Sequence, residues 1–585
     1  MADSYYLIAA TFIPLLLAPA AYFISKKFGP NAVTWFSFGI LALSTALLLL
    51  PSLGINGYKS AYVESYKWSQ FGNFGLRLDG LSLPFASIIY ILCTVLALYS
   101  KPYMIHKIKE AFHESGNNHG QGSHPEQHSE NHYPAGQLSS GSGTLVISET
   151  KEEQYVNHHM GLYFGLYLTF SMGMIGTVLA TNLIEFYVFF ELMLVPSFFL
   201  LAFYGYGARK RIALMFFFWT HAGAVVLLLG LLAMGFFAGG FDYDTVKANV
   251  SRIPAQWLGI IIFSLVIGLG VKLAAFMLHI WLPYAHAEAP TPISALLSPA
   301  MIGIGAYGLL RLWLELLAGD YSQYSIYINL WGLATMIYGG AMAMMQDDIK
   351  KVLAYSSVSQ MGYILFGLGS DSMLGITGGT LMYVSHGLGK AILFMMAGSI
   401  ILQTGTRKMS ELGGLGGKMP YTAVIAMIGA LTIMGIPPTS GFMAEWILFN
   451  GVLQTGVTNS DTLRVIAFGL GILATVLSSA YILWMYKRIF FGKLPEKYVN
   501  VRDSSRYITV TMAVLAALTL FLGTYPNPIL NPLTAYIQGM FATDSHVLPI
   551  PNTAPAVQTN VTLPVTSTNM NYDDPIKTQL LEVGH

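Results

Sequence analysis

Five ionisable side chains lie deep inside apolar stretches of this sequence, and their types suit the movement of protons. They are Glu191, Lys272, His386, Lys390 and Glu445. A charged side chain at the centre of a bilayer costs roughly 3 kcal/mol or more, so its presence there indicates a functional path. A carboxylate beside a lysine favours the protonated lysine, and separating the two releases the proton. We therefore predict a proton relay built from these five residues.

The stretch VIGLGVKLAAFMLHIWLPYAHAEAP, residues 266–290, holds Lys272 about fifteen residues into an apolar run that begins near Trp257. A lysine close to a membrane surface extends its ammonium group into water, but this depth makes that alternative difficult. Glu191, in EFYVFFELMLVPSFFL, is flanked by apolar and aromatic residues, and its alternative role is a packing carboxylate near a helix end. We predict that Glu191 and Lys272 form a switchable pair, with His279 and His286 along the path.

His386 and Lys390 occur four residues apart in YVSHGLGKAILF, so they share one face of a helix. A histidine exchanges protons near neutral pH, which suits a relay. The alternative is a structural histidine whose ring is bonded to a backbone carbonyl. Two ionisable groups on one face favour the relay.

Glu445 follows a helix-breaking sequence in LTIMGIPPTSGFMAEWILF. The breaking residues are Pro437, Pro438 and Gly441. They predict an interrupted helix directly before the carboxylate. Pro283 and Pro290 punctuate the span after Lys272 in a similar way, although the sequence does not fix where that helix opens.

Membrane-length helices must position these residues. The chain has 585 residues, of which 54% are hydrophobic and 10% charged, and its mean hydropathy is +0.56. We predict an all-α polytopic membrane protein with about fourteen transmembrane helices. The predicted spans are 5–25, 32–52, 81–101, 160–181, 183–204, 211–238, 257–281, 292–318, 326–346, 352–369, 373–403, 421–453, 465–490 and 507–525.

Charge and cysteine content limit orientation, partners and cofactors. Lysines and arginines gather in the loops after odd-numbered spans, which places those loops in the cytoplasm and both termini on the outer side of the cell (plasma) membrane. The first apolar run follows MADSYY without a basic segment, so we expect a retained helix and no cleavable signal. The net charge of +1 argues against a nucleic-acid partner, and the single Cys93 excludes a disulfide or cysteine-bound metal cluster within this chain.

The spans and loops predict six segments. These are 1–101 with helices 1–3, a polar His-rich cytoplasmic insertion at 102–159, a first repeat at 160–318, a second repeat at 326–490, a last helix at 507–525, and an extended polar tail outside at 526–585. Two of the predicted spans, 257–281 and 421–453, are interrupted and carry a charged residue. They are the seventh and the twelfth span along the chain, so they are five apart. Spans 4–8 and 9–13 are therefore predicted as two inverted five-helix repeats with broken helices, as in transporters.

Other polar residues carry weaker predictions. Asp79, in FGLRLDGLSLPF, is either a helix cap or a carboxylate at the outer mouth. Arg311 and Glu315 are four apart and are expected to pair with each other. The insertion is expected to be a flexible linker, with a metal site as the alternative because it is rich in histidine. Its histidines are His106, His113, His119, His124, His128, His132, His158 and His159.

Several long motifs together resemble the antiporter-like membrane subunits of respiratory complex I, above all the subunit M type, called ND4 in mitochondria. They are VFFELMLVPSFFLLAF, GVKLAAFMLHIWLPYAHAEAPTP, DDIKKVLAYSSVSQMGYILFG, SHGLGKAILF and GIPPTSGFMAEWILF, and the resemblance covers roughly residues 70–490. It implies fourteen helices, two inverted repeats with broken helices, and one proton path per subunit.

The resemblance also assigns roles residue by residue. Glu191 matches the family's essential glutamate, Lys272 its partner lysine and His386 its histidine of the second half. Glu445 matches the glutamate that distinguishes the M type from the L type. His279 and His286 fall on the family's LHxWLPDAH stretch, here LHIWLPYAH.

Three departures from the M-type pattern predict a divergent member and favour an archaeal source. Gly303 stands where the family usually has a central lysine, in SALLSPAMIGIGAYGLLR. Lys390 is a feature of the L type, and Gln360 replaces a frequent histidine. We expect the central relay to be rerouted through water, Ser298 and the pair His386 and Lys390, or to be weakened.

The combined interpretation is a proton-translocating subunit of a complex I-like quinone oxidoreductase, driven by redox chemistry in other subunits. The resemblance implies partners of the L, N, K, J, A and H types and a peripheral redox arm. It implies no cofactor in this chain, and iron–sulfur clusters and quinone in the partners. One alternative is a subunit of an Mrp-type cation/proton antiporter or of a membrane-bound hydrogenase. Another, of a different class, is a non-conducting scaffold, for which Gly303 is the best argument.

Overall fold

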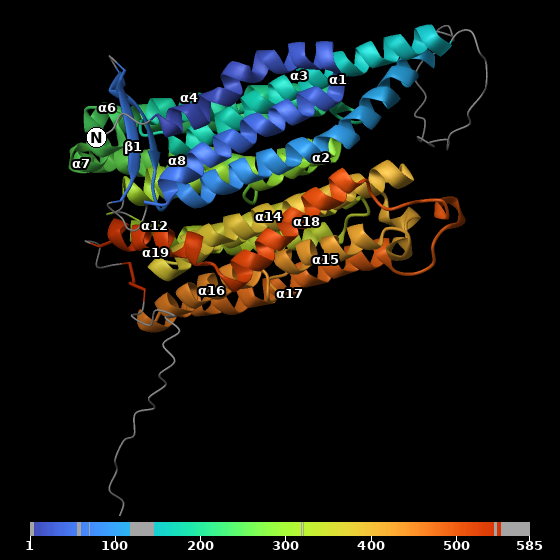
Figure 1. The fold of residues 1–585 in the computed structure, drawn as a ribbon. Coiled ribbons are helices and arrows are strands. Elements are labelled where there is room, and N and C mark those ends of the chain that lie inside the picture. Colours follow the sequence, from blue (N-terminus) through green and yellow to red (C-terminus); the bar gives the residue numbers. More distant parts are fainter. Residues whose placement is uncertain are drawn as a thin grey trace, which may run out of the picture. The chain divides into compact units, whose positions relative to one another are not determined.

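The helices of the computed structural model run side by side along one common direction (Figure 1). The structure describes residues 5–54, 60–68, 71–117, 145–317, 319, 321–542 and 547–550. Within these residues, ten helices are long and apolar enough to cross a membrane. Their outer faces carry exposed large apolar side chains, among them Phe23, Phe218, Phe263 and Leu473. The chain is therefore a multi-pass membrane protein whose outer faces suit contact with lipid.

The first part of the chain combines long helices with a small hairpin. Its elements are α1 (Tyr6–Ser52), β1 (Tyr62–Lys67), β2 (Asn73–Leu78), α2 (Ser82–Asn117) and α3 (Leu145–Leu179). The two predicted spans 5–25 and 32–52 lie in α1, whose backbone leaves the helical conformation at Gly29. Strands β1 and β2 pair antiparallel, with Tyr62 opposite Leu78. The sequence analysis did not predict this hairpin.

The middle of the chain consists of shorter, interrupted helices. They are α4 (Leu183–Leu192), α5 (Leu194–Tyr204), α6 (Arg209–Ala238), α7 (Tyr243–Ala248), η2 (Val250–Arg252), α8 (Ala255–Leu273), α9 (Trp281–Glu288), α10 (Thr291–Leu296), η3 (Leu297–Met301), α11 (Gly303–Gly308) and η4 (Leu309–Glu315). The segments η3 and η4 are π-helical turns, so the helix from Thr291 to Glu315 is continuous but twice widened. Such widened turns are frequent at functional sites.

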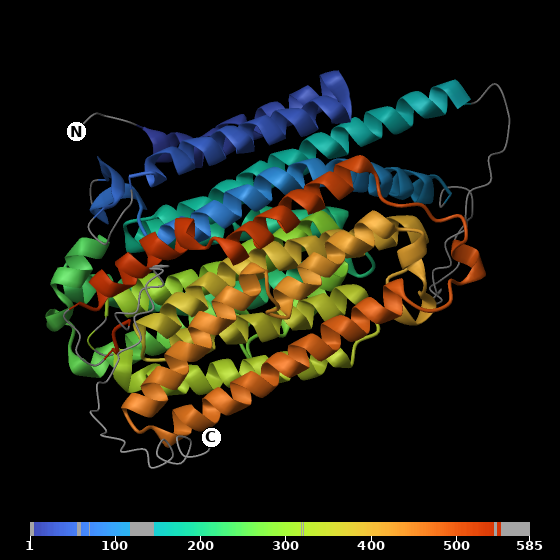
Figure 2. The same ribbon diagram turned by 60° about the horizontal axis from the view of Figure 1, so that its bottom comes forward.

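The last part of the chain is built around a buried helix. Its elements are α12 (Tyr321–Met344), α13 (Ile349–Leu368), α14 (Met373–Thr404), η6 (Met409–Glu411), η7 (Leu415–Gly417), α15 (Pro420–Ile433), α16 (Ser440–Thr458), α17 (Thr462–Phe490), η8 (Glu496–Tyr498), α18 (Arg506–Thr524) and α19 (Asn527–Met540). Nearly all residues of α14 from Met373 to Ile400 are buried. This helix packs against α2, α10, α13, α15, α16, α18 and α19. Figure 2 shows α1 to α3, in blue to teal, on one side of the bundle and α15 to α17, in orange, on the other.

Two membrane-spanning regions are broken, and the sequence located one of the breaks. Helix α15 ends at Ile433 and α16 begins at Ser440, so the interruption falls at the predicted Pro437 and Pro438. The other break lies between α8 and α9, at residues 274–280. Pro283 lies inside α9 rather than at this break. The chain turns instead at Ala274 and Met277, which both have positive φ.

The predicted polar insertion at 102–159 requires correction at both ends. Helix α2 continues to Asn117 and α3 already begins at Leu145, so residues 102–117 and 145–159 are helical. Lys109 and Glu152 join the two extensions through an ion pair of 2.7 Å. The rings of Phe112 and Tyr155 also pack there, with centroids 5.3 Å apart. The helices therefore continue past their apolar spans because they contact each other. His119, His124, His128 and His132 lie outside the described residues.

The prediction of an extended tail from residue 526 is wrong at its beginning. Asn527 to Met540 form the helix α19. Leu533, Tyr536, Ile537 and Met540 are its buried residues, and their spacing places them on one helical face. Proline and asparagine in this segment suggested extended structure, but burial of the apolar face favours the helix. Residues 551–585 lie outside the described part of the chain.

Candidate functional site

Lys272 lies at the broken end of α8, where the chain turns away from the helix axis. Its side chain is only 1% exposed. The helix ends one residue later, and Ala274 takes the left-handed conformation with φ 58°. The Trp281 indole N–H donates to the Val271 carbonyl at 2.9 Å, and the Trp331 indole N–H donates to the Phe276 carbonyl at 3.1 Å. Side chains thus satisfy carbonyls that the break leaves open, as a membrane interior requires.

Glu191 has an ion-pair partner that the sequence analysis missed. Its Oε2 lies 3.0 Å from Nδ1 of His221, on α6. The ammonium group of Lys272 lies 4.7 Å from the ring centroid of Phe190 instead. The described residues contain no direct ion pair between Glu191 and Lys272, although the charge of Glu191 acts on the lysine. An isolated histidine in the apolar run FFFWTHAGAV was the available sequence signal for His221.

The two predicted path histidines have different environments. His279 lies within the break, and its Nε2 is 3.2 Å from the hydroxyl of Tyr338. His286 lies in α9 and is fully buried. Neither ring nitrogen of His286 has a hydrogen-bond partner among the described residues, and its ring packs 5.2 Å from that of Phe394. A buried imidazole with both nitrogens unsatisfied is available for proton exchange.

The position of Gly303 is filled by an aromatic ring from another helix. A Cβ atom at residue 303 would lie 1.9 Å from the ring of Tyr383. This ring, from α14, stacks on that of Phe85 with centroids 4.3 Å apart. No side chain fits at 303 while Tyr383 is in place. The structure therefore explains the missing central lysine by steric exclusion.

The widened helix from Thr291 to Glu315 is called the central helix below. Lys390 reaches from α14 toward the first widened turn of this helix, η3. Its Nζ donates to the Leu353 carbonyl at 3.0 Å, and the Ser357 hydroxyl donates to the same carbonyl at 3.0 Å. The Ser357 hydroxyl in turn lies 2.6 Å from that of Ser298 in η3. The lysine is fully buried and has no carboxylate partner among the described residues. Lys390 thus brings a cationic group close to the segment from which Tyr383 excludes a lysine.

His386 lies one turn before Lys390 on the same buried helix, as predicted. Both ring nitrogens lack hydrogen-bond partners in the part of the chain that the structure describes. The charge of Lys390 acts on His386, and the charges of Lys350 and Lys390 act on His286. Lys390 is therefore within electrostatic reach of both histidines.

Glu445 lies close to the break between α15 and α16, and its carboxylate occupies space that a side chain at Gly435 would fill. Its carboxylate is 8% exposed, and its Oε1 has no partner among the described residues. Gly435 has φ +64°, and a Cβ there would lie 2.2 Å from Oε2 of Glu445. Hydroxyl groups lie nearby: the charge of Glu445 acts on Tyr363 and Tyr481. The predicted carboxylate therefore faces polar groups from α13 and α17.

Lys350 is a second buried group that the sequence analysis missed. It lies in the first turn of α13, which follows the loop after the predicted span 326–346, yet it is fully buried. Its Nζ donates to the carbonyl oxygens of Ala287, at 3.3 Å, and Ala289. It also lies 5.3 Å from the ring centroid of Tyr206. Lys350 lies between Asp348 and Lys351 in the sequence, so this charged stretch looked like a loop. Only the tertiary packing shows that Lys350 is buried.

A fully compensated charge cluster lies at the opposite end of the central helix. Arg311 donates to Asp79 at 2.8 Å and to Glu315 at 2.6 Å, which confirms the predicted pair. Asp79 also caps α2, because its Oδ1 accepts from the Ser82 N–H at 2.9 Å. Burial opposes ionisation of Asp79, but Arg311 and Arg77 hold the pKa of its carboxyl well below the usual range. Asp79 therefore has a structural role, and of the two predicted alternatives the helix cap is confirmed.

The described residues contain no cluster of three or more His, Cys, Asp or Glu side chains that could hold a metal ion. Four of the eight histidines of the alternative metal site lie in residues 118–144, outside the described part. His113, which is described, faces Glu152 at 3.4 Å.

The fold and these groups define a class: a multi-pass helical membrane protein with broken helices and ionisable side chains through its interior. Residues 180–473 match the family NADH:quinone oxidoreductase/Mrp antiporter, TM. The chain belongs to this family and is of the subunit M type.

Relatives and solved structures agree with this assignment. F(420)H(2) dehydrogenase subunit M of Methanosarcina mazei is 36% identical over 396 residues, which cover 66% of this chain and 77% of the relative. NADH-quinone oxidoreductase subunit M of Rickettsia typhi is 32% identical over 370 residues, covering 63% and 73%. A chain in respiratory complex I from Thermus thermophilus with bound NADH has the same fold, with a TM-score of 0.72 and 22% identity, covering 91% of this chain and 99% of that one.

Proposed function

We propose that this chain translocates protons as a membrane subunit of a complex I-like quinone oxidoreductase, through Lys272, His286, Lys390, His386 and Glu445. Membership of the family supports the class of function. The observation that carries the relay is the buried, unpaired state of its central groups. Lys390 has only a carbonyl partner and His386 has none among the described residues. Ionisable groups without fixed counter-charges change protonation more readily than paired ones.

The relay that we propose passes through Lys390 rather than through residue 303. Tyr383 excludes a side chain at Gly303, whereas Lys390 is within electrostatic reach of both His286 and His386. Protons would pass from Lys272 and the α9 histidines to Lys390, then to His386, and leave near Glu445. His279 belongs to the same path through its position in the α8–α9 break.

The trigger that we propose is an exchange of partners at Glu191. The carboxylate pairs with His221, and Lys272 rests on the neighbouring Phe190 ring. The side chains of Glu191 and His221 are 21% and 42% exposed. A neighbouring membrane subunit can therefore reach this pair. Movement of Glu191 between His221 and Lys272 would change how firmly the lysine holds its proton.

The assembly that we propose follows the family pattern. The chain has fourteen transmembrane helices, with spans 4–8 and 9–13 as inverted repeats, and the breaks at α8–α9 and α15–α16 support corresponding positions in the two halves. It lies in the plasma membrane with both termini outside. Its partners are membrane subunits of the L, N, K, J, A and H types and a peripheral arm. That arm holds the iron–sulfur clusters and the quinone site, and this chain holds no redox centre.

Two alternatives have specific support. A subunit of an Mrp-type cation antiporter, or of a membrane-bound hydrogenase, shares the fold, and the family description names the Mrp antiporter. A non-conducting scaffold is supported by the ring of Tyr383 at the usual lysine position. The buried and unpaired Lys390 argues against the scaffold.

The first experiment isolates the chain from its native membrane with its partners and identifies them by mass spectrometry. Iron–sulfur and quinone-site subunits would support the redox-driven pump, and their absence with sodium transport would support the antiporter. In vesicles holding the complex, we expect Lys272→Ala to lower proton translocation roughly tenfold, the loss of one proton-transfer group. Lys210→Ala, an exposed lysine of α6, is the control. Unchanged translocation in Lys272→Ala would contradict the relay.

A further inference from the structure

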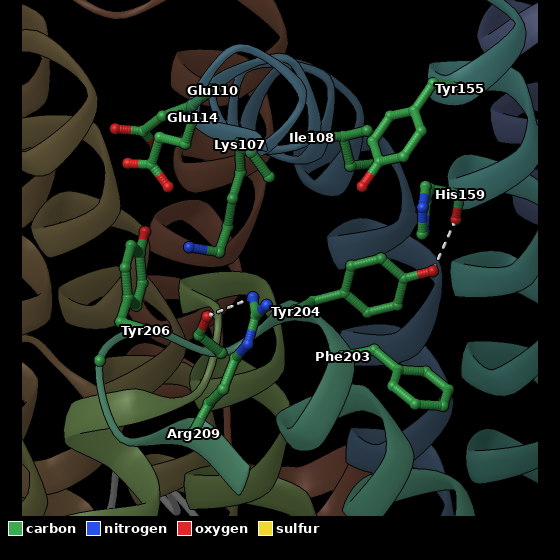
Figure 3. Close-up of a pocket in the computed structure, with 13 residues that line it drawn as sticks. Lys107, Ile108, Glu110, Glu114, Tyr155, His159, Phe203, Tyr204, Tyr206 and Arg209 are labelled. Carbon is green, nitrogen blue, oxygen red and sulfur yellow. Dashed lines mark hydrogen bonds between the residues drawn. The ribbon is translucent and has the colours of Figure 1, made fainter. Parts of the chain in front are cut away.

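A polar cavity of about 350 Å³ lies where the end of α2 meets the loop between α5 and α6 (Figure 3). Its lining combines charged, aromatic and glycine residues from four helices and this loop. The ionisable groups among them are Lys107, Glu110, Glu114, Tyr155, His159, Tyr204, Tyr206 and Arg209. Carboxylates and a histidine in one cavity supply groups that exchange protons with water.

Tyr206 lines this cavity and also contacts a buried lysine. The Lys107 ammonium lies 3.1 Å from the centroid of the Tyr206 ring, and Figure 3 shows its side chain reaching toward that ring. The buried Lys350 ammonium also contacts this ring, at 5.3 Å. Tyr206 therefore has one lysine from the cavity lining and one lysine from the buried interior beside the same ring.

Two buried hydroxyl groups continue inward from Tyr206. The hydroxyl of Tyr206 is hydrogen-bonded to that of Tyr103 on α2. The Tyr103 hydroxyl also accepts a hydrogen bond of 3.0 Å from the Thr291 hydroxyl, at the start of α10. Tyr103 and Thr291 are both fully buried. Three hydroxyl groups thus form an unbroken chain from the cavity to the central helix.

The inner end of this chain lies close to His286. The Thr291 side chain packs against Gly398, since a Cβ at Gly398 would lie 2.8 Å from its methyl group. The His286 ring packs against Phe394. Residues 394 and 398 are four apart on α14, about one helical turn and a rise of about 6 Å. Thr291 and the unpartnered ring of His286 therefore lie against neighbouring turns of the same helix.

We propose that this cavity is the proton uptake site of the subunit and that Tyr206, Tyr103 and Thr291 conduct protons from it toward His286. A proton from the cavity binds the Tyr206 oxygen while the Tyr206 hydroxyl proton passes to Tyr103. The Thr291 hydroxyl donates to Tyr103 in the structure, so it first rotates toward His286. Tyr103 then passes its own proton to Thr291, and Thr291 passes its proton to the imidazole through a bridging water. Each hydroxyl ends neutral, and rotation of the hydroxyl groups resets the chain. The inference rests on the proposed function, because it supplies the relay with protons.

The test compares two tyrosines of helix α2 in the intact complex. The complex is reconstituted into vesicles, and both electron transfer and proton translocation are recorded. Tyr103→Phe removes the middle hydroxyl, and we expect translocation to fall roughly tenfold. Tyr99→Phe is the matched control. Its ring stacks on that of Tyr103 with centroids 6.1 Å apart, but its hydroxyl donates to the Met395 carbonyl at 3.2 Å. We expect Tyr99→Phe to leave translocation unchanged.

A second pair of variants separates conduction from packing. Thr291→Val keeps the shape of the side chain and removes the hydroxyl, whereas Thr291→Ser keeps the hydroxyl. We expect the valine variant to lose translocation about tenfold and the serine variant to retain it. Equal translocation in both variants, or an equal loss in Tyr103→Phe and Tyr99→Phe, would overturn the uptake chain.

Lys272→Ala, measured in the same vesicles, separates the uptake chain from the proposed function. If Lys272→Ala lowers translocation and Tyr103→Phe does not, the uptake chain is wrong and the relay stands. If neither changes translocation, the proposed function fails as well.

Discussion

Two groups of buried charges in this chain are organised in opposite ways. At the end of the central helix, Arg311 is held by Asp79 and Glu315, and the hydroxyl of Tyr536 bonds to both Arg311 and Glu315. Near the first widened turn, Lys390 has one carbonyl partner. Both groups are buried to a similar degree. The difference lies in the presence of counter-charges, and it separates charges that hold the fold from charges that are free to change.

The physical consequence follows from the cost of burying charge. A buried ion pair with complete hydrogen bonding is costly to break, because removing one partner leaves the other uncompensated. A buried lysine without a carboxylate already bears that cost in the native state. The compensated cluster therefore fixes β2, α2, the central helix and α19 together. The unpaired groups reduce stability, and the proposed proton relay gives a physical reason for their presence.

The largest expected effect comes from breaking the compensated cluster. Arg311→Met leaves Asp79 with the partly exposed Arg77, and Glu315 with Arg77 and the exposed Lys247. We expect the free energy of unfolding to fall by about 3–5 kcal/mol, the cost of one uncompensated buried charge. Thermal unfolding of the detergent-solubilised complex, followed by size exclusion, measures the change. Arg252→Met, an exposed arginine, is the control and should be neutral. A neutral Arg311→Met would remove the distinction between the two groups.

A smaller effect than that of Arg311→Met is expected in the pH dependence of the free energy of unfolding, and Asp79 determines its sign. The pKa of Asp79 is held well below its usual range by Arg311 and Arg77, against the opposing effect of burial. Its ionised form therefore stabilises the protein fully above the unfolded pKa of about 4, and this contribution is lost as the pH falls further. We expect the stability difference between the natural protein and Asp79→Asn to be constant from pH 7 to 5 and to shrink below pH 4. A constant difference down to pH 2 would contradict this role.

The smallest change in the free energy of unfolding is expected for Lys390, which has no carboxylate partner among the described residues. It contrasts most sharply with the change expected for Arg311. Lys390→Met keeps the length of the side chain and removes a charge that has no carboxylate partner among the described residues. We expect the free energy of unfolding to stay within about 1 kcal/mol or to rise, while proton translocation falls. Thermal unfolding and translocation measured on one preparation test both parts. A large loss of stability would show that Lys390 serves the fold.

Prediction from the sequence succeeded where the type of a residue and its neighbours along the chain are enough to predict its environment. A lysine or glutamate within an apolar run is visible without any structure, so the buried positions of Lys272, Lys390 and Glu445 were predicted correctly. Consecutive prolines located the break before α16. Prediction failed where contacts between distant segments decide. His221 becomes important only through Glu191, and the helix α19 forms because its apolar face is covered.

The sequence by itself determined that this is a multi-pass helical membrane protein of its family, with ionisable residues inside its spans. Periodicity, apolar run length and motifs are local properties, so they can be read along the chain. Only the tertiary structure decided which of those residues have counter-charges. It pairs Glu191 with His221, buries Lys350, and places the Tyr383 ring where residue 303 would carry a side chain. The physical reason is that desolvation and pairing depend on the neighbours that packing brings together, and those neighbours are distant in sequence.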